Sequence, residues 1–148
     1  MLVVDDSQDE VDLLRRALSS HVSLEIAHVA RDGQDALDYL LHKGEFLNQS
    51  APAPDLILLD LHMPRVDGLE VLRRVKSDEL LALIPVVMFS SSNRAEDIAD
   101  CYRLGANTYI QKPAAFQEYA RTISLLAQYW GALAQLPPQQ HRSGRAVA

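Results

Sequence analysis

The amino-acid sequence predicts a single α/β domain built on a doubly wound, five-stranded parallel sheet with helices on both faces. Short apolar runs alternate five times with longer segments whose apolar residues recur at helical spacing, which is typical of such a sheet. The run at 56–59, Leu-Ile-Leu-Leu, is apolar at every position, as a central strand covered on both faces should be. The length of 148 residues fits one compact domain.

The first part of the chain contains two strand–helix units. Residues 2–4 are expected to form the first strand, and Ser7 with Glu10 has the S-x-x-E form of a capping box at the start of the first helix. A second strand is expected over 24–29. Asp32 can cap the next helix, whose apolar stripe ends near Lys43 and Gly44.

The second part of the chain contains three further units. They follow the stretch 48–54, which contains two prolines and therefore predicts a loop. The expected elements are a strand at 56–59, a helix over 68–76, a strand at 86–89 after Pro85, a helix capped by Asn93 and Glu96 and ended by Gly105, a strand at 109–110, and a long last helix over 116–136.

The composition excludes several classes of protein. The net charge of −6 argues against a surface for nucleic acid or anionic membrane, which needs clustered Lys and Arg. The single cysteine, Cys101, can form neither an internal disulfide nor a thiolate metal cage. The apolar stretch 80–89 contains a proline and is half the length of a membrane span, and the N-terminus has no basic leader region. A cytoplasmic domain without nucleic-acid or membrane partners is expected.

Polar residues end the predicted strands. Asp5 and Asp6 follow the first strand, Asp60 the third, Ser90 the fourth and Lys112 the fifth. The carboxyl ends of parallel strands converge at one edge of the sheet, and three carboxylates there need a cation to remain ionised together. Oxygen ligands without a His or Cys pattern favour Mg²⁺ over Zn²⁺. A lysine and a hydroxyl suit phosphoryl oxygens, so the set predicts a phosphoryl-transfer site with a carboxylate acceptor.

Taken singly, each of these residues has an ordinary structural role. The aspartates could end strands or lie in solvated turns, the serine could cap a helix, and the lysine could be a surface residue. Five residues with unrelated ordinary roles at four strand ends of one small chain are far less probable than one shared site.

The spacing of these residues resembles that of the receiver domain of two-component response regulators. The resemblance covers about 2–136 and implies the flavodoxin-like receiver fold. It is carried by the Asp5-Asp6 pair, the pattern Asp60-x-x-Met63-Pro64-x-x-x-Gly68, Ser90 thirty residues beyond Asp60, and Lys112-Pro113 twenty-two residues beyond Ser90.

The resemblance implies a role for each of these positions. Asp60 would be the phosphoacceptor, taking its phosphoryl group from the phosphohistidine of a sensor histidine kinase. Mg²⁺ would be bound directly by Asp6 and Asp60 and by the backbone carbonyl of His62, and through water by Asp5. Ser90 and Lys112 would hold the phosphoryl oxygens, and Tyr109 would be the aromatic residue that moves with Ser90 in the switch.

Finer features are similar to stand-alone receivers that are paired with bacterial phytochrome-type histidine kinases. These are the extended stretch 42–54, the run 101–107, and Trp130 followed by Leu136-Pro137. The expected organisation is a receiver domain over 1–136 and a C-terminal tail over 137–148.

Other functions make different demands on the same residues. A haloacid dehalogenase-like phosphatase needs an acid/base Asp two residues after the nucleophile, where His62 stands, and a cap domain. A dinucleotide-binding module needs G-x-G-x-x-G after the first strand, where Asp5 and Asp6 would repel a pyrophosphate. A phosphorylation-independent interaction module stays open, although none of the acidic or lysine positions is missing.

The last helix predicts a homodimer. A helix over 116–135 would span roughly 30 Å, whereas a five-residue strand covers about 17 Å. Its apolar stripe continues through Trp130 and Leu133 into the expected overhang, where a second copy could cover it. The alternative is that these two residues fold back onto the edge of their own domain.

Overall fold

A computed structural model describes residues 1–49 and 53–138 as one layered α/β domain with a five-stranded, wholly parallel sheet in the order β2-β1-β3-β4-β5. This arrangement confirms the predicted fold class. The strands are β1 (Leu2–Val4), β2 (His28–Ala30), β3 (Ile57–Leu59), β4 (Val86–Ser90) and β5 (Thr108–Gln111).

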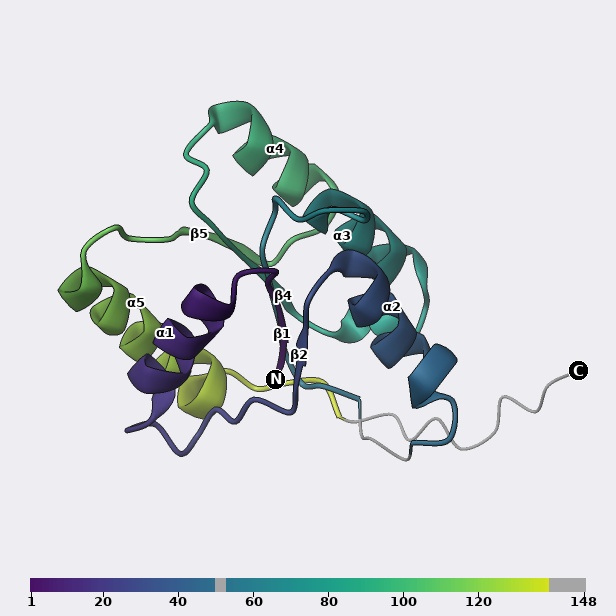
Figure 1. Ribbon diagram of the computed structural model, residues 1–148, viewed down its shortest axis with the longest axis horizontal. Coiled ribbons are helices and arrows are strands. Elements are labelled where there is room, and N and C mark those ends of the chain that lie inside the picture. Colours follow the sequence, from purple (N-terminus) through teal and green to yellow (C-terminus); the bar gives the residue numbers. More distant parts are fainter. Residues whose placement is uncertain (50–52, 139–148) are drawn as a thin grey trace, which may run out of the picture.

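Helices cover both faces of this sheet (Figure 1). Helices α1 and α5 pack together on one face, and α2, α3 and α4 lie on the other. The elements are α1 (Gln8–Leu18), α2 (Gly33–Leu41), α3 (Gly68–Ser77), α4 (Ala95–Arg103) and α5 (Phe116–Gln128), with the short turns η1 (Gly44–Phe46), η2 (Leu81–Leu83) and η3 (Tyr129–Leu133). None of the helices in the described residues is both long and apolar enough to cross a bilayer.

The strand register aligns the carboxyl ends of the central strands. Val4 of β1 pairs with Leu59 of β3, which in turn pairs with Met88 of β4. The Asp60 N–H donates to the Val4 carbonyl at 2.9 Å, so the chain continues in sheet geometry up to the acidic residues. On the other side of β4, the Lys112 N–H donates to the Ser90 carbonyl at 2.8 Å.

Two local predictions were wrong. The second strand covers His28–Ala30 rather than 24–29, because Leu24 packs into the core on the α1 side instead of joining the sheet. Asn93 does not cap the fourth helix: Arg94 occupies the N-cap without a side-chain hydrogen bond. The Arg94 N–H instead meets the Ser92 hydroxyl oxygen at 3.3 Å.

The last helix is shorter than predicted. Regular α-helix ends at Gln128 and is followed by the π-helical turn η3, in which the Ala134 N–H donates to the Tyr129 carbonyl at 2.7 Å. A Cβ on Gly131 would lie 2.7 Å from the Ser23 carbonyl oxygen, so a glycine lets this turn approach the loop after α1. Trp130 packs against the core of its own domain, as the alternative interpretation expected, whereas Leu133 does not and stays 71% exposed. The predicted tail lies outside the described residues from 139 onward.

Candidate functional site

Three carboxylates meet at the carboxyl edge of the sheet. Asp5, Asp6 and Asp60 each offer an oxygen, and these oxygens lie within 4.8 Å of one another. Asp5 is buried, Asp6 is exposed and Asp60 is intermediate, so the cluster opens to solvent on one side. An open group of hard oxygen ligands fits a magnesium-type cation, and the donor set therefore agrees with the metal that the sequence predicts.

The surroundings of Asp60 work against its ionisation. Burial raises the pKa of the Asp60 carboxyl, the nearby Lys112 ammonium lowers it, and the charges of Asp5 and Asp6 raise it again, with a net shift above the usual value. The Asp60 Oδ1 accepts a hydrogen bond from the Leu61 N–H at 2.7 Å. The other oxygen, Oδ2, lies 3.7 Å from the Lys112 Nζ.

Lys112 is the cation inside the site. Its Nζ donates to the Asp5 Oδ2 at 2.7 Å and lies 3.7 Å from both Asp60 and Glu10, while the side chain is 8% exposed. Burial lowers the pKa of this ammonium, but the hydrogen bond to Asp5 and the surrounding negative charges outweigh it and hold the pKa above its usual value. Lys112 is therefore charged at neutral pH and partly neutralises the acidic cluster.

Glu10 was assigned only a capping role from the sequence. Half of that capping box is present: the Ser7 hydroxyl oxygen accepts from the Glu10 N–H at 3.3 Å. The Ser7 N–H donates to the Asp5 Oδ1 at 2.9 Å instead of to Glu10. The Glu10 Oε2 is shielded from solvent, has no hydrogen-bond partner among the described residues and faces Lys112. In the sequence, the signal for a fourth carboxylate near Lys112 was the presence of Glu10 in the first turn of α1.

The predicted hydroxyl and aromatic residues belong to β4 and β5. Ser90 is fully buried at the end of β4, and its hydroxyl oxygen accepts from the Ser92 N–H at 3.3 Å. The Tyr109 hydroxyl donates to the Ser92 carbonyl at 2.8 Å. Burial raises the pKa of the Tyr109 phenol. Ser92, which had no assigned structural role, thus connects Ser90 to Tyr109.

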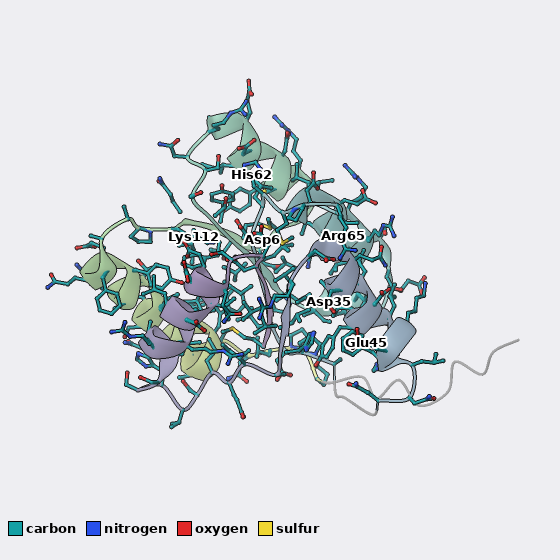
Figure 2. The ribbon with its side chains drawn as sticks, viewed as in Figure 1. Asp6, Asp35, Glu45, His62, Arg65 and Lys112 are labelled. Atoms are coloured by element: carbon teal, nitrogen blue, oxygen red, sulfur yellow. The ribbon has the colours of Figure 1, made fainter. Side chains whose placement is uncertain are left out.

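The loop between β3 and α3 is fixed by contacts that the motif did not predict. Arg65 adopts the left-handed conformation at φ 64° and forms an ion pair with buried Asp32, the N-cap of α2. A Cβ on Gly68 would lie 2.2 Å from the Asp60 carbonyl oxygen, which explains why the motif needs glycine there. His62 also belongs to this loop. Figure 2 shows His62, Asp6 and Arg65 near the carboxyl edge of the sheet.

Asp97 lies beside His62 and Ser92, and sequence reasoning did not identify it as a residue of the site. Its Oδ2 accepts from the Ser92 hydroxyl at 2.6 Å and lies 3.6 Å from the His62 Nε2. Asp97 belongs to α4, whereas His62 and Ser92 belong to the loops after β3 and β4. No spacing rule links these three residues, because they meet only through the fold.

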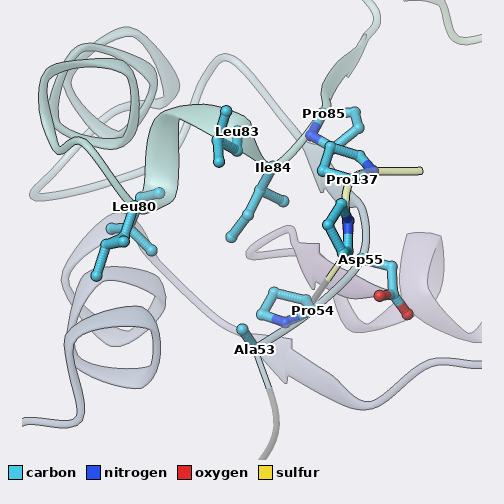
Figure 3. Close-up of a pocket in the computed structure, with 10 residues that line it drawn as sticks. Ala53, Pro54, Asp55, Leu80, Leu83, Ile84, Pro85 and Pro137 are labelled. Atoms are coloured by element: carbon cyan, nitrogen blue, oxygen red, sulfur yellow. The ribbon is translucent and has the colours of Figure 1, made fainter. Parts of the chain in front are cut away.

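A second hollow lies near the amino ends of β3 and β4, far from this chemistry (Figure 3). It is lined mainly by apolar residues, including Pro54, Leu80, Leu83, Ile84 and Pro137. Asp55 is the one titratable residue among its described lining. The convergent polar groups therefore favour the carboxyl edge as the candidate functional site.

Known proteins with similar sequences share this architecture. The sequence profile of the response regulator receiver domain matches residues 1–124. Response regulator Rcp1 of Synechocystis is 32% identical over 137 residues, which cover 93% of this chain and 92% of that protein. The probable methanogenesis regulatory protein FilR2 of Methanothrix harundinacea is 37% identical over 131 residues, which cover 88% of this chain and 82% of that protein.

Solved structures give the same result. The phosphorylated cyanobacterial phytochrome response regulator RcpA superposes with a TM-score of 0.85 at 38% identity, covering 92% of this chain and 96% of that one. The Mn²⁺-bound form of Rcp1 superposes with a TM-score of 0.84 at 32% identity, with the same coverage.

Proposed function

This chain belongs to the response regulator receiver family, and we propose that it accepts a phosphoryl group on Asp60 from the phosphohistidine of a sensor histidine kinase. The observation that carries the proposal is the position of Asp60 within reach of the oxygens of Asp5 and Asp6 and of the Lys112 ammonium. A nucleophilic carboxylate, a metal-binding pair and a fixed cation are the parts that phosphoryl transfer needs.

The proposed cation is Mg²⁺, held by Asp6, Asp60 and the backbone carbonyl of His62, with Asp5 binding through water. When bound, it supplies positive charge to the phosphoryl oxygens. Support comes from the oxygens of the three carboxylates, which lie within 4.8 Å of one another, and from the Mn²⁺-bound form of the relative Rcp1.

The residues of the chain perform the remaining steps. A carboxylate oxygen of Asp60 forms the new bond to phosphorus while the bond to the histidine nitrogen of the kinase breaks, and the electron pair of that bond stays on the nitrogen. Lys112 is 3.7 Å from Asp60 and can exchange its bond to Asp5 for one to a phosphoryl oxygen. Ser90 donates its hydroxyl hydrogen to another phosphoryl oxygen, and both residues act by charge and position.

The signal is a conformational change that begins at Ser90. Phosphorylation adds roughly 1.5–2 negative charges, which attract hydroxyl and N–H donors of the loop after β4. Ser92 in that loop is bound to the Tyr109 hydroxyl at 2.8 Å, so displacement of the loop also moves the aromatic residue on β5. The result is a two-state switch between phosphorylated and unphosphorylated surfaces.

The chain is a signalling protein in this proposal, and its only chemistry is on its own aspartate. A phosphorylation-independent interaction module is the second candidate, and it is less favoured because every acidic and lysine position of the site is present. Incubation with a small-molecule phosphodonor and Mg²⁺, followed by peptide mass mapping, should place one phosphoryl group on Asp60. An unmodified Asp60 peptide, under conditions that label a control receiver, would overturn the proposal.

The proposed partner is a kinase of the bacterial phytochrome type in the cytoplasm. Support comes from the relatives, since RcpA is described as a phytochrome response regulator and covers nearly the whole of this chain. The proposed receiver domain spans 1–136, and the remaining residues, 137–148, form a tail. The net charge of −6 and the single cysteine are consistent with this setting and with the absence of a nucleic-acid or membrane partner.

We also propose that the protein forms a homodimer through the outer face of the last helix. Tyr119, Ile123 and Leu126 of α5 are buried in the core of the domain, so they are not available to a partner. Leu125, Tyr129 and Leu133 follow one another at four-residue intervals and are 57%, 50% and 71% exposed. Two copies of such a stripe can pack against each other across a two-fold axis and remove both from water.

The dimer proposal predicts a mass change on a single substitution. Leu133→Glu should convert a dimer at tens of micromolar into a monomer in analytical ultracentrifugation, because it places a charge at the most exposed residue of the apolar stripe. Leu83→Glu is the matched control: Leu83 is 49% exposed in η2, away from this helix, and its variant should remain dimeric. A monomeric wild type, or an L133E variant that dimerises as well as wild type, would contradict the proposal.

A further inference from the structure

Asp97 joins two loops that are separate in the sequence and flank the proposed phosphoacceptor. A single oxygen, Oδ2, accepts from the Ser92 hydroxyl at 2.6 Å and lies 3.6 Å from the His62 Nε2. In Figure 2 the label of His62 lies between α4 and Asp6. The Asp97 side chain is 16% exposed, and that of His62 is 64% exposed, so the contact with Ser92 is the more shielded of the two.

Ser92 is held at each of its polar groups. Its hydroxyl donates to Asp97, its N–H meets the Ser90 hydroxyl oxygen at 3.3 Å, and its carbonyl accepts from the Tyr109 hydroxyl at 2.8 Å. The Ser92 hydroxyl oxygen also accepts from the N–H of Arg94, the residue that precedes α4, at 3.3 Å. A restraint applied to the Ser92 side chain therefore reaches both the hydroxyl that would bind a phosphoryl oxygen and the aromatic residue on β5.

We propose that Asp97 is a positioning residue that stabilises the loop after β4 in the arrangement found here and so opposes its displacement toward a phosphoryl group on Asp60. The inference rests on the proposed function. It follows from the contacts because the 2.6 Å Ser92–Asp97 hydrogen bond fits the present position of Ser92, so a displacement of Ser92 while α4 stays in place would distort or break it. A contact that exists in one of two states shifts the equilibrium toward that state by its differential free energy.

Two substitutions at this position separate its two contacts. Asp97→Asn keeps an oxygen that can accept from the Ser92 hydroxyl but removes the charge that attracts His62. Asp97→Ala removes both contacts. If the bond to Ser92 is the restraint, the alanine variant should change the loop equilibrium and the asparagine variant should change it much less.

Beryllofluoride, which mimics a phosphoryl group on an aspartate, is the probe. In the presence of saturating Mg²⁺, Asp97→Ala should bind beryllofluoride on the order of five-fold more tightly than wild type, a shift of about 1 kcal/mol. Asp97→Asn should stay within about two-fold of wild type, while Mg²⁺ affinity should be the same in all three proteins. Asp100→Ala is the control, since Asp100 is on the same helix and pairs only with exposed Arg103 among the residues described.

Ser92→Ala gives an independent measurement of the same contact. It should bind beryllofluoride more tightly by the same factor as Asp97→Ala. The double variant should gain no more affinity than either single one, because both substitutions remove the same Ser92–Asp97 hydrogen bond. Unchanged or weaker beryllofluoride binding by Asp97→Ala, or additive gains in the double variant, would overturn the inference. Failure of the wild type to bind beryllofluoride would instead show that the proposed function itself is wrong.

Discussion

Asp60→Asn is expected to fold normally and to accept no phosphoryl group from any donor. The substitution is nearly isosteric, and its side-chain oxygen can still accept from the Leu61 N–H, which is 2.7 Å from the carboxylate oxygen in the wild type. It removes the anionic nucleophile that the proposed transfer requires. Phosphodonor labelling should therefore fall by at least about 100-fold, a loss of more than about 2.7 kcal/mol in transition-state stabilisation.

The same substitution should not lower thermal stability in metal-free buffer at neutral pH. Because burial and the charges of Asp5 and Asp6 raise the pKa of the folded Asp60 carboxyl, its ionisation costs stability as the pH rises through that pKa. An amide does not pay this cost. Asp60→Asn should thus melt at or above the wild type at neutral pH, and its advantage should vanish at a pH below the unfolded value of about 3.9.

Melting curves in a chelator, at neutral and at acid pH, test this second part. Asp67→Asn is a useful comparison, because Asp67 is exposed and caps α3 through the Glu70 N–H. Because Asn caps a helix about as well as Asp, that variant should lose only the small stabilisation that a carboxylate gains at a helix N-terminus. A clear drop in the melting temperature of Asp60→Asn without Mg²⁺ would mean that Asp60 is a structural residue.

Mg²⁺ is expected to stabilise the wild type and to leave Asp6→Ala unchanged. An ion that binds the folded carboxylate cluster and not the unfolded chain adds about 2.7 kcal/mol at one hundred times its Kd. Asp6 is the most exposed of the three carboxylates, so its removal should eliminate ligand charge without opening a cavity in the core.

The matched control for the metal is Asp9→Ala. Asp9 is an exposed acid in the first turn of α1, so its loss changes the net charge by the same amount outside the cluster. Chemical denaturation with and without Mg²⁺ should give the full stabilisation in Asp9→Ala. Equal responses of the Asp6 and Asp9 variants would place the cation elsewhere.

The fold and the members of the site could be predicted because both depend on local signals and one topological rule. The all-apolar run at 56–59 identified the central strand, and parallel strands necessarily bring Asp5, Asp60 and Ser90 to one edge. Motif spacing assigned the remaining positions without any knowledge of distances.

The contacts that the sequence did not reveal are tertiary. Asp97 meets His62 and Ser92 only after α4 is placed against two loops, and Arg65 meets Asp32 across 33 positions. Trp130 was expected in an overhang of a long helix, but the regular helix ends at Gln128 and Trp130, in the π-helical turn, packs against the core of its own domain. Helical periodicity does not predict such turns.

The burial of Lys112 among acids has a consequence for the protein before any signal arrives. Its ammonium, 2.7 Å from Asp5 and 3.7 Å from Asp60 and Glu10, serves as a resident counter-ion. Without it the domain would depend on a bound cation to offset the repulsion within its own acidic cluster. With it, the domain can fold without a bound metal, even though Mg²⁺ adds stability, so a scarcity of divalent ions should stop phosphoryl transfer while most molecules stay folded.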